Sequence, residues 1–322
     1  MSHGENGSAI PVTIIGGFLG AGKTTLLNRI LNDDHGLRLA ILVNDFGAVN
    51  IDTRLLPEKQ GVDFVDLPNG CICCTLARGL ISAVEQVISA VPPPDHIFIE
   101  ASGVSSPGAV EALLDVPDLS GRVKVESIIT LVDALNVRKL AAVVMFAGDQ
   151  IASADLLIIN KTDLVNEEEL ADVMAWIGKT APDARMIKTE YARLPLDLVV
   201  GNGRRASSEH AGQPEQVQHD HDDHGQLYQS WTFSAEEPLS EEVLLDAIAA
   251  LPPAIYRAKG VVYLDRDPRR RYVLQLVGRR SSLTADRGWG EQEPATQLVF
   301  IGERGAFDTA KLARELARRT RS

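Results

Sequence analysis

Cysteine is scarce in this chain and gathered in one place. The 322 residues include three cysteines, all within the segment Cys71–Cys74. Three thiols so close together cannot form the disulfide framework of a small secreted protein. Grouped thiols are instead typical of metal ligands, and they indicate a reducing compartment.

Long apolar runs and an excess of positive charge are also missing. No unbroken apolar stretch approaches the roughly 20 residues of a membrane span, and the first seven residues lack the basic and apolar pattern of a signal peptide. The net charge of −12 opposes binding to phosphate backbones and anionic lipids. We therefore expect a cytoplasmic protein whose main partner is neither nucleic acid nor a membrane.

Alternating short β-branched runs and longer helical patterns extend from residue 11 to about residue 200. This alternation predicts an α/β fold with a mostly parallel sheet flanked by helices. The predicted strands are Val12–Ile15, Leu39–Val43, Val62–Val65, Ile97–Glu100, Ser127–Val132, Leu156–Ile159 and Met186–Lys188. The predicted helices are Lys23–Leu31, Leu76–Val91, Pro107–Leu114, Ala134–Phe146 and Glu167–Trp176.

Residues 201–226 contain few large apolar side chains, which predicts a flexible linker between two domains. We expect a flexible N-terminus at 1–10, a first domain at 11–200 and a smaller α+β domain at 227–322. In the second domain the predicted strands are Tyr228–Phe233, Tyr256–Leu264, Tyr272–Val277 and Thr296–Ile301, and the predicted helices are Ser240–Leu251 and Phe307–Arg319.

A phosphate-binding loop is predicted at residues 17–24, which read Gly-Phe-Leu-Gly-Ala-Gly-Lys-Thr between a strand and a helix. Glycines let backbone N–H groups approach phosphates, Lys23 neutralises charge at the transferred phosphoryl, and Thr24 offers its hydroxyl to Mg²⁺. The alternative is a tight glycine-rich turn without a ligand. The predicted nucleotide-binding residues of this loop are Gly17, Gly20, Ala21, Gly22, Lys23, Thr24 and Thr25.

Glu100 ends the predicted strand Ile97–Glu100 and is the expected carboxylate for Mg²⁺ or for its water. Gly103 follows three residues later, where its backbone N–H could sense a γ-phosphate. We assign Lys23 and Glu100 to catalysis. A capping role for Glu100 is the alternative.

Asn160-Lys161-Thr162-Asp163 follows an apolar strand and fits the Asn-Lys-x-Asp pattern of GTPases. The carboxylate of Asp163 can accept hydrogen bonds from N1–H and the exocyclic amino group of guanine, a donor pair that adenine lacks. Asn160, Lys161 and Asp163 are therefore predicted to select GTP. A solvated helix start is the alternative reading.

Cys71, Cys73 and Cys74 lie just before a predicted helix. Thiolates at a helix N-terminus are stabilised there and bind soft or borderline cations such as Zn²⁺, Cu⁺ and Co²⁺. Three ligands leave an open coordination position. Such an open site suits metal transfer better than a closed, four-ligand structural site does. Small cysteines buried in a packed turn are the alternative.

The predicted linker carries a second group of potential metal ligands, His219, His221 and His224, interspersed with aspartates. Imidazoles and carboxylates on a flexible segment can catch a divalent ion with little geometric selectivity. A merely solvated acidic linker is the alternative.

Together these motifs resemble the CobW family of P-loop metallochaperone GTPases. The resemblance includes the segments 16–25, 44–47 (Asn-Asp-Phe-Gly), 69–74, 100–103 and 160–163, and it continues in 257–260 and 298–302. It implies a GTPase that forms GDP and phosphate with Mg²⁺ held by Thr24, Asp45 and Glu100. Asp45, which stands where many members have glutamate, joins Lys23 and Glu100 as a candidate catalytic residue.

The resemblance further implies that the protein hands a transition metal, zinc or cobalt, to a client metalloprotein. Two other functions stay open at this point. One is a zinc-sensing regulatory protein whose GTP turnover is incidental. The other is a small-molecule kinase, which shares the phosphate-binding loop but needs neither the guanine motif nor the cysteines.

Overall fold

The computed structural model describes residues 9–33, 36–43, 62–66, 74–101, 106–143, 147–200 and 227–317. The chain divides into two compact units, Met1–Gly203 and Arg204–Ser322, and each is described by itself. Within the described residues, no helix combines the length and apolar character needed to cross a membrane.

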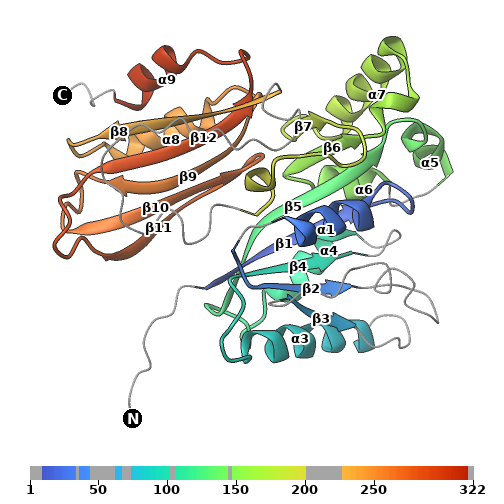
Figure 1. Cartoon of the computed structure of the whole chain (residues 1–322), viewed down its shortest axis with the longest axis horizontal. Helices are drawn as coiled ribbons and strands as arrows, with labels where there is room; N and C mark the ends of the chain where they lie inside the picture. Colours follow the sequence, from blue (N-terminus) through green and yellow to red (C-terminus); the bar gives the residue numbers. More distant parts are fainter. Residues whose placement is uncertain are drawn as a thin grey trace. The chain divides into compact units, whose positions relative to one another are not determined.

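The first unit is built on a parallel sheet (Figure 1). Its strands in the described residues are β1 (Ile10–Gly17), β2 (Leu39–Val43), β3 (Val62–Asp66), β4 (His96–Glu100), β5 (Val123–Asp133), β6 (Leu156–Asn160) and β7 (Arg185–Lys188). Their order is β3-β2-β4-β1-β5-β6-β7, and all six neighbouring pairs are parallel. Because the strands point the same way, the loop after β1 and the ends of β4, β5 and β6 share one edge of the sheet.

Helices cover this sheet. Among the described residues they are α1 (Lys23–Asn32), α3 (Cys74–Ile88), α4 (Pro107–Leu114), α5 (Val137–Val143), α6 (Ala147–Ala152) and α7 (Glu167–Thr180), with short 3₁₀ turns η1 (Thr162–Leu164) and η2 (Leu196–Leu198). Alternate residues of β1, such as Val12 and Ile14, pack with Leu80 and Val84 of α3 and Val110 of α4. Side chains of one strand face alternate sides, so these residues build the core on one face of the sheet.

In its described residues, the second unit pairs an antiparallel sheet with helices α8 and α9 (Figure 1). Its elements are β8 (Tyr228–Ala235), α8 (Glu241–Ala249), β9 (Ile255–Tyr263), β10 (Arg270–Val277), β11 (Arg280–Gly288), β12 (Thr296–Glu303) and α9 (Thr309–Leu316). The strand order is β11-β10-β9-β12-β8. Leu244 and Ile248 of α8 and Leu312 of α9 share one core with Leu274 and Phe300 of the sheet.

The predicted fold class is confirmed: an α/β unit with a parallel sheet precedes a smaller α+β unit. The predicted helix Ala134–Phe146 was wrong at its start, because residues 133–136 form a turn held by Asp133 and α5 begins at Val137. Helix α6 and strand β11 were not predicted. Strand β11 lies at the edge of its sheet and carries one large aliphatic side chain, Leu283, so its sequence lacks apolar alternation.

Candidate nucleotide site

The loop between β1 and α1 has a backbone that glycine permits. Gly17, Gly20 and Gly22 have φ angles of 132°, 78° and 111°, a region that side chains with a Cβ disfavour. A Cβ at Gly17 would lie 2.5 Å from the carbonyl oxygen of Leu131 in β5. Helix α1 starts directly afterwards, with Gly22 as an N-cap that provides no side-chain hydrogen bond. The first N–H groups of a helix have no intrahelical acceptor, so this end is suited to an anion.

Lys23 and Glu100 are buried together at this loop. The Nζ atom of Lys23 donates to the carbonyl oxygens of Gly17 at 2.9 Å and Phe18 at 3.4 Å. It also lies 3.8 Å from Oε1 of Glu100, at the end of the neighbouring strand β4. The two predicted catalytic residues that the structure describes are thus brought into one ion pair at the carboxyl edge of the sheet.

Asn160, the last residue of β6, ties three segments together. Its Nδ2 donates to the carbonyl oxygen of Ala21 in the phosphate-binding loop at 2.9 Å, and its Oδ1 accepts from the backbone N–H of Ala192 at 2.9 Å. The approach to the loop is tight, because a Cβ at Gly22 would lie 2.4 Å from the same Nδ2. Both ends of the Asn160 amide are therefore used in joining distant parts of the chain.

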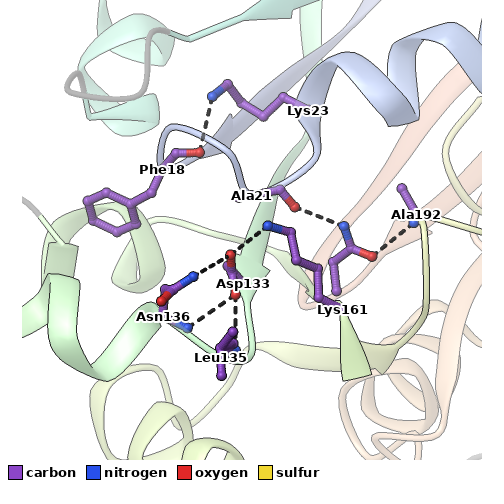
Figure 2. Close-up of polar contacts among 9 residues, drawn as sticks. Phe18, Ala21, Lys23, Asp133, Leu135, Asn136, Lys161 and Ala192 are labelled. Atoms are coloured by element: carbon purple, nitrogen blue, oxygen red, sulfur yellow. Dashed lines mark hydrogen bonds and ion pairs between the residues drawn. The ribbon is translucent and has the colours of Figure 1, made fainter. Parts of the chain in front are cut away.

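Lys161 forms an ion pair with a residue that the sequence analysis did not select, Asp133 (Figure 2). Its Nζ lies 2.7 Å from Oδ2 of Asp133, which also accepts from Nδ2 of Asn136 at 3.1 Å. The other oxygen, Oδ1, accepts from the backbone N–H groups of Leu135 at 3.0 Å and Asn136 at 3.1 Å. Burial alone would raise the pKa of Asp133, but the bonds from Lys161 and Asn136 outweigh it and hold this pKa below its usual value.

Asp163 lies on η1, where its side chain is exposed. The preceding Thr162 donates to the carbonyl oxygen of Thr189 through its hydroxyl at 3.2 Å and its backbone N–H at 3.3 Å. These bonds join η1 to the segment 189–192, in which Tyr191 and Ala192 both have φ angles of 52°. Residues 160–163 are consequently attached to the segment that follows β7.

The other predicted site residues fall into two groups. Thr24 is half-buried and Thr25 is exposed in the first turn of α1, while Cys74 is the first residue of α3. Asp45, Gly103, Cys71, Cys73, His219, His221 and His224 lie outside the described residues. Within the ranges that are described, no group of three or more His, Cys, Asp or Glu residues could hold a metal ion.

Two parts of this arrangement were missed by sequence reasoning. Asp133 comes directly after an apolar strand, the same position that drew attention to Glu100 and Asn160, so the signal was available. The segment 189–192 follows a short, weakly apolar strand and contains no recognisable motif. Its place beside Asn160 depends on the pairing of β6 with β7, which local sequence does not specify.

Two family models match this chain, one in each unit. Residues 11–188 match the model described as CobW/HypB/UreG, nucleotide-binding domain. Residues 228–320 match the model described as cobalamin synthesis protein cobW C-terminal domain. The two matches follow each other in the order that the sequence motifs predicted.

Named relatives extend over nearly the whole chain. A protein named zinc chaperone CobW from Pseudomonas aeruginosa is 33% identical, over 95% of this chain and 90% of that protein. Zinc chaperone YjiA from Escherichia coli is 29% identical, over 91% and 94%. The crystal structure of Zn(II)-bound YjiA GTPase from E. coli aligns over 97% of this chain and 99% of that one, with 23% identity and a TM-score of 0.45. The chain belongs to the CobW family, and with this membership the prediction of a GTPase is confirmed.

Proposed function

We propose that this chain is a GTP-dependent metallochaperone, which binds zinc at Cys71, Cys73 and Cys74 and delivers it to a client metalloprotein. The observation that carries the nucleotide part is the bond from Asn160 to Ala21, 2.9 Å long. It joins the guanine motif to the phosphate-binding loop, so one nucleotide can engage both. GTP and GDP are then the ligands of a single site.

Selection of guanine is assigned to Asn160, Lys161 and Asp163. Asp163 is exposed and free to meet a base, and η1 fixes its backbone. Its carboxylate accepts from N1–H and the exocyclic amino group of guanine. Adenine offers no such pair of donors, so with ATP the carboxylate would lose its hydrogen bonds.

The phosphate half of the site fits GTP with Mg²⁺. Its side chains offer hard oxygen donors, the Thr24 hydroxyl and the Glu100 carboxylate, and Asp45 would complete the set. When bound, Mg²⁺ neutralises charge on the phosphate oxygens. The backbone of residues 17–25 and the Gly103 N–H cradle the phosphates in this proposal.

Lys23 and Glu100 have distinct tasks in hydrolysis. The buried ammonium of Lys23 now rests on carbonyl oxygens of its own loop, and it turns to the phosphate oxygens when GTP binds. This places positive charge where negative charge develops at the transferred phosphoryl. Glu100 and Asp45 orient the attacking water, and GDP and phosphate are the products.

The chemistry of the three thiols and their position in the chain both favour a metal cargo. Helix α3 starts at Cys74, after a connection that leaves the carboxyl end of β3. This is the same edge as Glu100, and β3 lies two strands, or about 10 Å, from β4. Thiolates suit zinc, with cobalt as the second choice. Two relatives are named zinc chaperones, which favours zinc.

Two secondary features complete the proposal. His219, His221 and His224 would collect metal for the thiol site with little selectivity. The protein would act in the cytoplasm, where reducing conditions keep the three thiols able to bind metal.

Zinc affinity measured against a coloured chelator tests the proposal, with the chain bound to GTP and Mg²⁺, bound to GDP, or free of nucleotide. We expect tighter binding with GTP by about 5-fold to 150-fold, because coupled ligands favour the same arrangement. Replacing both Cys73 and Cys74 by serine should remove this coupling and leave metal-free GTP binding intact. Replacing His219, His221 and His224 by glutamine is the matched control and should change the coupling little.

Equal zinc affinity in all three states would contradict a nucleotide-driven carrier and favour a static metal site. Adding a metal-free client protein separates the remaining functions. Faster GTP hydrolysis and zinc transfer support a metallochaperone, whereas a client without effect supports the zinc-sensing regulator. Transfer of phosphate to a metabolite instead of water would identify a kinase.

A further inference from the structure

The geometry points to Asp133 as a positioning residue of the guanine site, which acts by holding Lys161. This inference rests on the proposed role of Lys161 in binding the base. It adds a residue on a different strand, β5, to a site whose proposed motif begins at Asn160, the last residue of β6. The ion pair of 2.7 Å between Lys161 Nζ and Asp133 Oδ2 is its starting point (Figure 2).

The turn 133–136 keeps the Asp133 carboxylate in one orientation. Oδ1 accepts two backbone N–H groups, those of Leu135 and Asn136, and Oδ2 accepts from the Asn136 side chain. The bonds to Oδ1 are sufficient to close the turn. Oδ2 is directed at Lys161. Because the Asp133 side chain is only 6% exposed, its carboxylate is held in place and is not a mobile surface charge.

Lys161 needs such an anchor more than most lysines. Its backbone lies in the left-handed region, with φ 62° and ψ 37°, a conformation that costs energy for a residue with a Cβ. Its side chain is 31% exposed, and the ammonium lies at the end of a four-carbon stem that can adopt many rotamers. The ion pair selects one of them before any nucleotide arrives, so binding does not have to order this side chain.

Asn160 and Lys161 thereby fix the motif on two sides. Asn160 bonds to the phosphate-binding loop and to residue 192, and Lys161 bonds to the turn after β5. Asp163 lies two residues further along, so the backbone that leads to it is held by the contacts of both Asn160 and Lys161. Asp133 therefore contributes to nucleotide affinity without contacting the nucleotide.

Four full-length variants test this inference: Asp133→Asn, Lys161→Met, the double variant, and Asp155→Asn as a matched control. Asp155 is also a buried aspartate that accepts a backbone N–H, from Ile128 at 2.8 Å, but it precedes β6 at the end opposite Asn160. The measurements are the Kd of GDP by calorimetry, and kcat and KM for GTP.

We expect Asp133→Asn to raise the Kd of GDP and the KM of GTP about tenfold, with kcat within about twofold, since a charge-assisted bond to a binding residue is weakened. Asp155→Asn should leave the Kd of GDP unchanged. In the Lys161→Met background, Asp133→Asn should add less than about twofold, because residues that act through each other are not additive.

Two results would overturn the positioning role alone: an unchanged Kd in Asp133→Asn while Lys161→Met weakens binding, or a full tenfold effect of Asp133→Asn on top of Lys161→Met. An unchanged Kd in Lys161→Met would overturn the guanine role of Lys161 and this inference with it. If Asp133→Asn does not fold, Lys161→Arg decides. This variant keeps the ion pair and should stay within about threefold of wild type, and a loss equal to that of Lys161→Met would refute the anchor.

Discussion

The two halves of the proposed nucleotide site are built in different ways. The phosphate half is the continuous segment 17–25 together with Glu100 at the end of the next strand. The base half consists of Asn160, Lys161 and Asp163, and its contacts reach Ala21, Asp133 and the segment 189–192. One half is thus mostly local in sequence, and the other is assembled from four separated segments.

This difference separates the residues that provide affinity for any nucleotide from those that provide specificity for the base. A continuous loop offers backbone N–H groups and a lysine to any phosphate chain, whatever base it carries. In the proposed site, recognition of the base depends on Asn160, Lys161 and Asp163, and distant partners hold the side chains of the first two. Substitutions in the phosphate half should therefore affect all nucleotides alike, and substitutions in the base half should change the preference among them.

Lys23→Ala should have the largest effect. It removes the cation that would contact the phosphate oxygens and should weaken GTP and ATP equally, by about 100-fold, because hydrogen bonds to charged groups are worth about 1.5–3 kcal/mol. Calorimetry with both nucleotides and Mg²⁺ measures this.

Glu100→Ala is the informative companion, since it should keep GTP binding and slow hydrolysis. Wild-type hydrolysis in Glu100→Ala would transfer its role to another acid, with Asp45 the first candidate.

Asp163→Ala should have an intermediate effect that is confined to the base. Wild type should bind GTP at least about tenfold tighter than ATP, because ATP leaves the Asp163 carboxylate without its hydrogen bonds. The variant should lose this preference while its ATP affinity stays nearly unchanged. Equal affinities of wild type for the two nucleotides would refute guanine selection by this motif.

The smallest expected effect is on stability in acid. The pKa of Asp133 is lower in the folded protein than its ordinary value of 3.8. A depressed pKa adds stability that is complete above the unfolded value and is lost as pH falls toward the folded one. Urea unfolding should therefore show wild type losing its advantage over Asp133→Asn as the pH falls from about 5, through the ordinary pKa, toward the lowered one. A difference that does not change over this range would contradict the lowered pKa.

The sequence predicted the local parts of this molecule well. Strand β1 and helix α1 were predicted because apolar runs and the glycine-rich loop mark them directly, and the mostly parallel sheet was predicted from the alternation of strands and helices. The placement of Lys23 and Glu100 at the carboxyl edge of the sheet was also foreseeable, since parallel strands bring their carboxyl ends together.

The remaining parts depend on pairing between distant residues. The ion pair of Lys161 with Asp133 requires β5 and β6 to be neighbours, and the bond from Ala192 to Asn160 requires β7 beside β6. The local sequence pattern does not specify either of these strand pairings. Helix α5 was predicted too early for a related reason. Residues 134–136 have no strong helix-breaking residue, and it is the side chain of Asp133 that holds them in a turn.

The close approach of Gly22 to Asn160 restricts how this family can diverge. A Cβ at position 22 would lie 2.4 Å from the amide nitrogen of Asn160, and φ at Gly22 is 111°. Any side chain at position 22 would therefore displace the Asn160 amide and weaken its bond to Ala21, which joins the two halves. Selection on either half of the site therefore acts on the other, and the two positions are expected to be inherited together in any descendant that still binds GTP.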